Sequence, residues 1–111
     1  KENWEPFLAL GTPSGTRILT CVAQTIFNIL EYNFPLYESV AALRYHHQWS
    51  PDYIRVEDRG FHDKTSNELK KMGHSINIKN LGCRVQAIMK EDNGTLIGVS
   101  DPRGEGKSVG M

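Results

Sequence analysis

The 111-residue chain carries 13 basic and 13 acidic side chains, which gives it a formal net charge of zero. Its 39% hydrophobic and 23% charged residues are typical of globular protein, and its length suits one domain or part of a larger one. We expect no nucleic-acid partner, because no basic stripe is present. We also expect no membrane segment, because the longest apolar stretch, residues 18–30, is short and interrupted by polar side chains.

The first part of the chain predicts a strand followed by two helices. Residues 7–10 form a short apolar run that ends in a turn of small residues at 11–15, as a buried strand does. Apolar side chains then recur at three- and four-residue spacings over residues 16–33, which predicts a long amphipathic helix that Pro35 limits. A second, short helix is expected over residues 37–43.

The second part of the chain predicts a polar, aromatic loop or extended segment at residues 44–52 and a Gly-rich loop at residues 101–111. Between them four short strands are expected, at residues 53–57, 75–78, 85–90 and 95–100. Asn93–Gly94 is a strong hairpin signal between the last two. Strands of a hairpin pair antiparallel, so we predict an α+β fold in preference to a doubly wound parallel sheet.

A further helix is expected over residues 65–72. Thr65 and Glu68 have the spacing of a capping box, in which each side chain bonds the backbone of the other residue at the helix N-terminus. Gly73 then supplies the residue type that commonly follows a helix C-terminus.

Cys21 and Cys83 are the two cysteines of the chain, too few for a disulfide framework. They can pair once, or both can be free. Because free cysteine is among the most buried residue types, we expect both to be reduced structural residues. Cys21 lies on or near the apolar side of the predicted long helix, where a thiol is usually inert, so it is a weak candidate for a nucleophile.

The turn at residues 11–17 joins the first strand to the long helix and is the most informative feature of the sequence. Backbone N–H groups and the helix dipole at such a position stabilise anions and developing oxyanions. The alternative is a plain corner in which Ser14 is the helix N-cap, and the spacing by itself favours that alternative.

The four histidines do not indicate a metal site. His46 and His47 are adjacent, and adjacent side chains of an extended segment point to opposite faces. The HxH, HExxH and Cys/His spacings of metal sites do not occur. We therefore expect hydrogen-bonding or exposed histidines, and we predict no metal and no cofactor.

Charged residues from both ends of the chain could join in a polar network. Asp101, Arg103 and Arg17 are the candidates. For Arg103 we expect an ion pair at the surface, an arrangement that contributes little to stability.

Five segments, taken in order along the chain, carry the motifs of one protein family. Gly-Thr-Pro-Ser-Gly-Thr-Arg-Ile at residues 11–18 stands for the family's Gly-Ser/Thr-Pro-Gly-Gly-Ser/Thr-Arg-Ile. Ala-Leu-Arg-Tyr-His-His-Gln-Trp-Ser-Pro-Asp at residues 42–52 stands for Ala-Pro-Arg-Phe-His-His-Gln-Trp-x-Pro-Asp. Leu-x-x-Met-Gly-His, Val-Gln-Ala-Ile and Gly-x-Ser-Asp-Pro-Arg follow at residues 69–74, 85–88 and 98–103. Over nearly its whole length the chain resembles the γ-glutamyltransferases, also called γ-glutamyltranspeptidases.

The resemblance implies that residues 1–111 are the C-terminal portion of the family's small subunit, and so an incomplete domain. It implies an αββα sandwich of the N-terminal-nucleophile hydrolase type, shared with a large subunit and the remaining small-subunit segment of the same precursor. In the family the precursor cleaves itself, and the new N-terminal Thr attacks γ-glutamyl amides such as glutathione. The acyl group then passes to water or to an amino acid. The resemblance also implies a periplasmic, secreted or cell-surface location.

One catalytic element of the family carries over to these residues. The Gly-Gly pair that supplies the oxyanion-hole N–H groups corresponds to Ser14 and Gly15. Ser14 departs from the family pattern. If position 14 requires a positive φ, serine there is less stable than glycine by about 1–2 kcal/mol. The nucleophile's Thr-Thr-His-type motif and the substrate-holding Ser-Ser segment do not occur in these residues. Leu43 and Cys83 are departures of lesser consequence.

Three functions are compatible with this resemblance. The chain can be a fragment of an enzyme whose other segments supply the nucleophile, in which case we expect the isolated chain to be inactive. It can belong to a family member that has lost catalysis and acts as a structural or binding module, which the departure at Ser14 motivates. It can also belong to a related acylase with another acyl substrate, such as polyglutamate or a cephalosporin acyl group.

Overall fold

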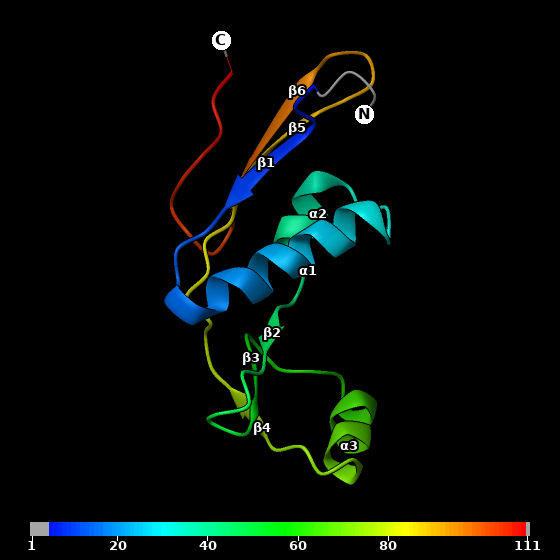
Figure 1. Ribbon diagram of the computed structural model, residues 1–111, viewed down its shortest axis with the longest axis vertical. Coiled ribbons are helices and arrows are strands. Elements are labelled where there is room, and N and C mark those ends of the chain that lie inside the picture. The colour runs from blue at the N-terminus through cyan, green and yellow to red at the C-terminus, as the bar shows by residue number, and fades with distance from the viewer. Residues whose placement is uncertain (1–4, 111) are drawn as a thin grey trace. The chain divides into compact units, whose positions relative to one another are not determined.

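The computed structural model describes residues 5–110, which form two compact units (Figure 1). Of these residues, the first unit contains 5–42 and 83–110, and the second contains 43–82. The elements of the first unit are β1 (Leu8–Gly11), the 3₁₀ helix η1 (Gly15–Arg17), α1 (Ile18–Leu30), α2 (Leu36–Ala41), β5 (Gln86–Lys90) and β6 (Leu96–Ser100). Those of the second unit are β2 (Tyr45–His46), β3 (Ile54–Val56), α3 (Asp63–Lys71) and β4 (Ile76–Ile78). The predicted α+β class is therefore confirmed.

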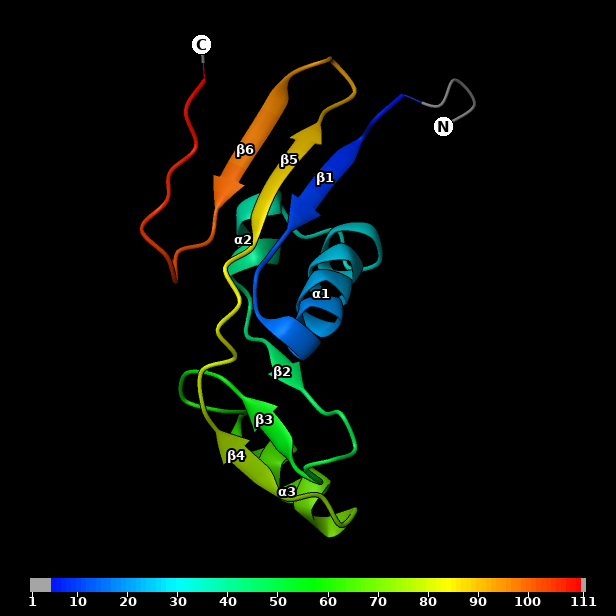
Figure 2. The same ribbon diagram turned by 60° about the vertical axis from the view of Figure 1, so that its left-hand side comes forward.

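The sheet of the first unit has the strand order β1-β5-β6, and both pairings are antiparallel (Figure 2). Ala87 of the central strand lies opposite Leu10 on one side and Val99 on the other, which places apolar side chains in one row. The predicted hairpin connects β5 to β6. Its loop closes through the Gly94 N–H, which donates to the Glu91 carbonyl at 2.9 Å, and Gly94 has a φ of 88°, a conformation that glycine adopts without steric cost.

The core of the first unit lies between this sheet and the helices α1 and α2, which cover one of its faces (Figure 2). Its buried members are Ile29, Leu36, Val40, Val85, Ala87 and Val99. The apolar side chains predicted to form one face of α1 are only partly covered: Leu19 is 78% exposed and Leu30 is 55% exposed. The apolar surface of this helix thus extends beyond what the described residues bury. Within residues 5–110 no helix is long and apolar enough to span a membrane.

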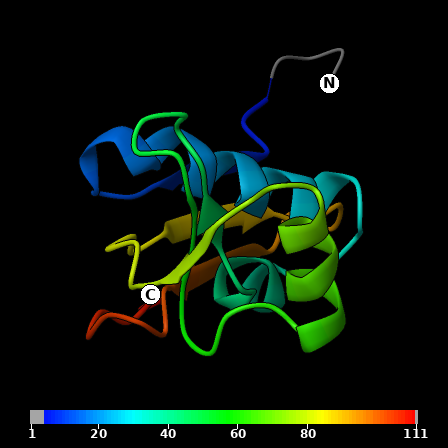
Figure 3. The same cartoon turned by 90° about the horizontal axis from the view of Figure 1, so that it is seen from below.

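The second unit contains a separate small sheet with the order β2-β3-β4, in which β2 and β3 are antiparallel and β3 and β4 are parallel. β3 and β4 fall on two of the predicted strands, and β2 lies inside the segment expected to be a loop or extended. Ile54 and Val56 are buried on either side of the half-buried Arg55, which is the alternation expected of a strand with one covered face. Figure 3 shows α3 to one side of β4, to which residues 72–75 connect it.

The helix α3 begins earlier than the sequence predicts. Its first residue is Asp63, and the N-cap position is occupied by His62, whose side chain makes no capping hydrogen bond. Thr65 therefore lies inside the helix, and the predicted capping box is wrong. The acidic Asp63 in the first turn is favourable beside the positive end of the helix dipole. The prediction for Gly73 is confirmed: it has a φ of 96°, and its N–H donates to a carbonyl of the last helical turn at 3.0 Å.

Cys21 and Cys83 form a disulfide bond, and both are fully buried. The expectation that both cysteines are reduced is therefore wrong, whereas their expected burial is confirmed. They are 62 residues apart in sequence, with Cα atoms 6.6 Å apart. They meet because the segment that leads into β5 passes the first turns of α1, an approach that only the folded chain defines.

Candidate functional site

The candidate site is the turn between β1 and α1. Ser14 has φ 127° and ψ 32°, and Gly15 has φ 56°, so two successive residues adopt positive φ. The 3₁₀ helix η1 follows at once and leads into α1. Position 14 thus has a positive φ, at which a residue with a side chain is strained. This is the conformation for which we expected serine to be less stable than glycine.

Ser14 stands at the N-cap position of η1, yet its side chain makes no capping hydrogen bond. Its hydroxyl oxygen instead accepts from Nε of Arg17 at 3.0 Å, and its carbonyl oxygen accepts from the Arg17 N–H at 3.1 Å. Ser14 therefore occupies the N-cap position of η1, as the alternative interpretation expected, but its side chain does not cap the helix. The side chain of Arg17 thus folds back on the turn and binds Ser14, the residue with the strained backbone.

Gly15 is exposed, and a Cβ atom placed there would meet no atom of the described chain within 4 Å. The turn is therefore open on this side. At the start of a helix the backbone N–H groups have no partner within the helix, and together with the helix dipole they stabilise negative charge. An oxyanion that forms during acyl transfer is a group of this kind.

The sequence did not reveal two links that attach this turn to the segment before β5. The N–H of Arg84 donates to the hydroxyl oxygen of Thr12 at 2.7 Å. The neighbouring Cys83 is bonded covalently to Cys21 in α1, and its sulfur lies 3.9 Å from the carbonyl oxygen of Arg17. The residues involved are separated by more than 60 positions, and nothing in their spacing predicts their contact.

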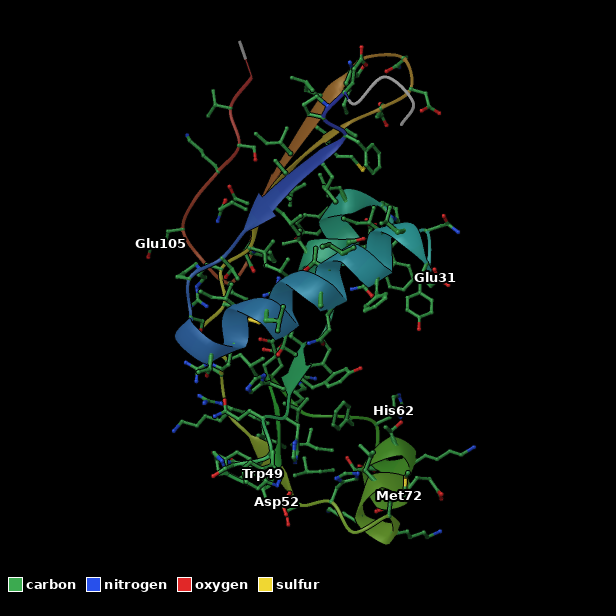
Figure 4. All side chains as sticks on the ribbon, viewed as in Figure 1. Glu31, Trp49, Asp52, His62, Met72 and Glu105 are labelled. Carbon is green, nitrogen blue, oxygen red and sulfur yellow. A yellow bond between two sulfur atoms is a disulfide. The ribbon has the colours of Figure 1, made fainter. Side chains whose placement is uncertain are left out.

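Two histidines of the second unit, His46 and His47, take part in side-chain hydrogen bonds, and His62 and His74 are exposed. Nδ1 of His47 accepts from the Trp49 N–H at 3.0 Å, so its Nε2 carries the proton and faces an oxygen of Asp52 at 3.2 Å. Nε2 of His46 lies 2.8 Å from the side-chain oxygen of Gln48. Figure 4 shows Trp49 and Asp52 together on this loop. Among residues 5–110 no group of three or more His, Cys, Asp or Glu side chains is arranged to hold a metal ion.

Asp101 and Arg103 form a buried network, and the expected surface pairing of Arg103 is wrong. The Asp101 side chain is fully buried, whereas that of Arg103 is 13% exposed, and their charged atoms are 3.0 Å apart. Asp101 also accepts from the N–H of Val85 at 2.8 Å, and the Arg103 guanidinium donates to the carbonyls of Val40, Ala41 and Ala42. This network joins the end of β6 to the end of α2.

The sequence model of the Gamma-glutamyltranspeptidase family matches residues 1–111. The chain belongs to the γ-glutamyltranspeptidase family.

Curated relatives of the chain carry the name glutathione hydrolase proenzyme. The protein of Escherichia coli (strain K12) is 40% identical over 102 residues, which are 92% of this chain and 17% of the relative. That of Pseudomonas aeruginosa is 39% identical over 108 residues, which are 89% of this chain and 18% of the relative. The chain therefore spans less than a fifth of the length of these relatives.

Solved structures of the γ-glutamyltranspeptidase family have the same fold. The enzyme from Pseudomonas nitroreducens, complexed with L-DON, aligns with a TM-score of 0.91 at 34% identity, over 100% of this chain and 58% of that chain. The T380A mutant of the Helicobacter pylori enzyme aligns with a TM-score of 0.83 at 40% identity, over 88% of this chain and 54% of that chain. The mixed α+β structure described above thus matches part of the γ-glutamyltranspeptidase fold.

Proposed function

We propose that this chain is the C-terminal part of the small subunit of a glutathione hydrolase/γ-glutamyltransferase, and that it supplies the oxyanion hole. The hydroxyl of an N-terminal Thr, in a segment outside these residues, attacks the γ-glutamyl carbonyl carbon. The carbonyl oxygen becomes an oxyanion that accepts hydrogen bonds from the N–H groups of Ser14 and Gly15. The oxyanion then reforms the carbonyl, the C–N bond breaks, and the amine leaves with the proton that the Thr hydroxyl gave up. The acyl group passes from the Thr ester to water or to an amino acid, and the Thr hydroxyl is restored.

The observation that carries this proposal is the pair of positive φ angles, 127° and 56°, at Ser14 and Gly15. The family motif has two glycines there, and this conformation explains why glycine suits both positions. A single donor in an oxyanion hole typically contributes about 10²- to 10³-fold to kcat. A strained serine is tolerated more readily at such a position than at a corner without a function, because strain concentrates at functional sites.

Exposed apolar side chains on the outer face of the β1-β5-β6 sheet support the proposal that this chain packs against a large subunit and the remaining small-subunit segment. On the side away from α1 and α2, Ile88 is 54% exposed and Leu96 is 68% exposed, with Ala9 exposed beside them. Monomeric proteins seldom expose a large contiguous apolar patch, and such patches commonly mark an interaction site. A second sheet from the remaining small-subunit segment and the large subunit, packed here in an αββα sandwich, covers these side chains.

The disulfide supports a location in an oxidising compartment. Disulfides persist in secreted, periplasmic and cell-surface proteins and are rare where thiols are kept reduced. The Cys21–Cys83 bond is therefore in keeping with a periplasmic, secreted or cell-surface protein.

Activity of the separate chain tests the proposal. We expect the purified 111-residue chain to release no p-nitroaniline from γ-glutamyl-p-nitroanilide, because the nucleophile is not among its residues, and we expect the complete protein to do so. The control is the complete protein with the Thr of the cleavage motif replaced by Ala, which we expect to be inactive. Turnover by the separate chain would contradict the assignment of the nucleophile to another segment.

A second candidate is a family member without catalytic activity, and the serine at position 14 is the observation that favours it. The two candidates differ upstream of this chain: a Thr-Thr-His-type cleavage motif supports the enzyme, and a full-length sequence without that motif supports the inactive member. In the complete protein, absence of both self-cleavage and hydrolysis would establish the second candidate.

A further inference from the structure

The hydroxyl of Thr12 makes two hydrogen bonds at the entrance to the turn. It donates to the carbonyl oxygen of Pro13 at 2.9 Å, and it accepts from the N–H of Arg84 at 2.7 Å. The Arg84 N–H occupies a lone pair of the Thr12 oxygen, and the single hydroxyl proton is directed at the Pro13 carbonyl oxygen. The direction of the Thr12 hydroxyl is thus set by a segment 72 positions away in sequence.

The Pro13 carbonyl belongs to the same peptide unit as the Ser14 N–H. A trans peptide is planar, and its C=O and N–H point in opposite directions. A hydrogen bond that holds the Pro13 oxygen therefore also sets the direction of the Ser14 N–H. This peptide unit enters the residue with φ 127°, where the backbone keeps an unfavourable conformation only if its surroundings hold it there.

The disulfide holds the other partner in place. Cys83 precedes Arg84 directly and is bonded to Cys21 in α1, so the Arg84 N–H cannot move away from Thr12 without moving this covalent attachment. Both half-cystines are fully buried, whereas Gly15 at the tip of the turn is exposed. The turn is therefore open at the reacting side and fixed at its base.

We propose that Thr12 is a positioning residue, which aims the Ser14 N–H at the oxyanion through the Pro13–Ser14 peptide. The Cys21–Cys83 disulfide acts through Arg84 to orient the Thr12 hydroxyl. This role rests on the proposed function of the Ser14–Gly15 turn. Thr12 touches no reacting atom, and its contribution is to the geometry in which the oxyanion is bound.

Two substitutions at this position separate the hydroxyl from the shape of the side chain. Thr12→Val removes the hydroxyl and keeps the volume, and Thr12→Ser keeps the hydroxyl and removes a methyl group. In the complete protein with γ-glutamyl-p-nitroanilide, we expect Thr12→Val to lower kcat about tenfold or more with KM changed less than about twofold, because a misaimed donor acts on the transition state. We expect Thr12→Ser to stay within about twofold of the parent kcat, because its hydroxyl makes the same two bonds.

Amide hydrogen exchange of the same proteins gives a readout independent of turnover. We expect faster exchange of the amides of residues 14–17 in Thr12→Val and also in the Cys21→Ala/Cys83→Ala double variant, with exchange in the β5–β6 hairpin unchanged. Parent-like kcat in Thr12→Val, or equal loss of kcat in Thr12→Val and Thr12→Ser, would overturn the positioning role. If the complete parent protein is inactive, the proposed function fails, and unchanged exchange in Thr12→Val then separately refutes the link from Thr12 to the turn.

Discussion

Ser14 is the residue at which local conformational preference and the folded backbone disagree. Its φ of 127° lies in a region that side chains rarely adopt, and the strain of such residues is on the order of 1–3 kcal/mol. The hydrogen bond from Nε of Arg17 to the Ser14 hydroxyl offsets part of this strain energy, since a hydrogen bond of this kind contributes about 0.5–1.5 kcal/mol to stability. The two magnitudes are similar, so serine is tolerated here although glycine is the better backbone fit.

A pair of substitutions at position 14 measures the strain. Ser14→Ala keeps the Cβ atom and removes the bond to Arg17, whereas Ser14→Gly removes both. We expect Ser14→Gly to be more stable than Ser14→Ala by about 1–2 kcal/mol in urea unfolding of the complete protein, because only glycine escapes the clash at positive φ. Equal stability of the two variants, or a more stable alanine variant, would show that position 14 carries no strain.

At the scale of the elements, the end of α2 is stabilised by a side chain from beyond β6. The guanidinium of Arg103 donates to three successive carbonyls, those of Val40, Ala41 and Ala42, at 2.8–3.1 Å. Carbonyls at a helix C-terminus have no partners within the helix, so a cation there satisfies them and also suits the helix dipole. Asp101 holds the guanidinium in position at 3.0 Å. This contact ties helix, strand and loop together.

We expect Asp101→Asn to lower the free energy of unfolding by about 2–4 kcal/mol, because it leaves the Arg103 cation buried without its counter-charge. The matched control is Glu68→Gln, which removes the carboxylate of an ion pair with Lys71 whose side chains are 60% and 73% exposed. An exposed pair of this kind contributes less than about 1 kcal/mol. Chemical denaturation of the complete protein carrying each substitution compares the two effects. A loss of stability at Asp101 no larger than at Glu68 would mean that the buried network contributes little to stability.

At the scale of the whole molecule, the chain leaves much apolar surface uncovered. Phe27 is 58% exposed on α1, and Ile88 and Leu96 lie open on the sheet face opposite the helices. Sheet edges and apolar faces without partners favour association between chains. We therefore expect the separate 111-residue chain to associate with itself, and to show no sharp, cooperative thermal transition as a monomer.

A lysine on the open sheet face tests this expectation. Ile88→Lys places a charge at the centre of the face, and we expect it to shift the separate chain toward smaller species in sedimentation velocity. Met72→Lys adds the same charge at a residue that is 74% exposed and belongs to the second unit, not to this sheet, and we expect it to have little effect. Association that is equally sensitive to both substitutions would indicate a general charge effect and not a specific apolar face.

The fold was predictable to the extent that it depends on neighbouring residues. Apart from β2, which lies in a segment expected to be a loop or extended, the strands and helices were predicted in the right order, because the periodicity of apolar residues and the positions of Gly and Pro are local signals. The start of α3 was missed, since Asp63 and His62 begin the helix without the side-chain capping that Thr65 and Glu68 suggested. The candidate turn could be located from its small residues and its family motif, and its role remains a prediction.

The sequence by itself determined the α+β class, the family and the position of the turn, because these follow from patterns carried by adjacent residues. Only the tertiary structure decided that Cys21 is bonded to Cys83, that Asp101 is fully buried and that the Arg84 N–H donates to the Thr12 hydroxyl. It also decided that Ser14 adopts a positive φ. Each of these depends on segments that are distant in sequence and meet only when the sheet and its helices have packed, so no local pattern records them.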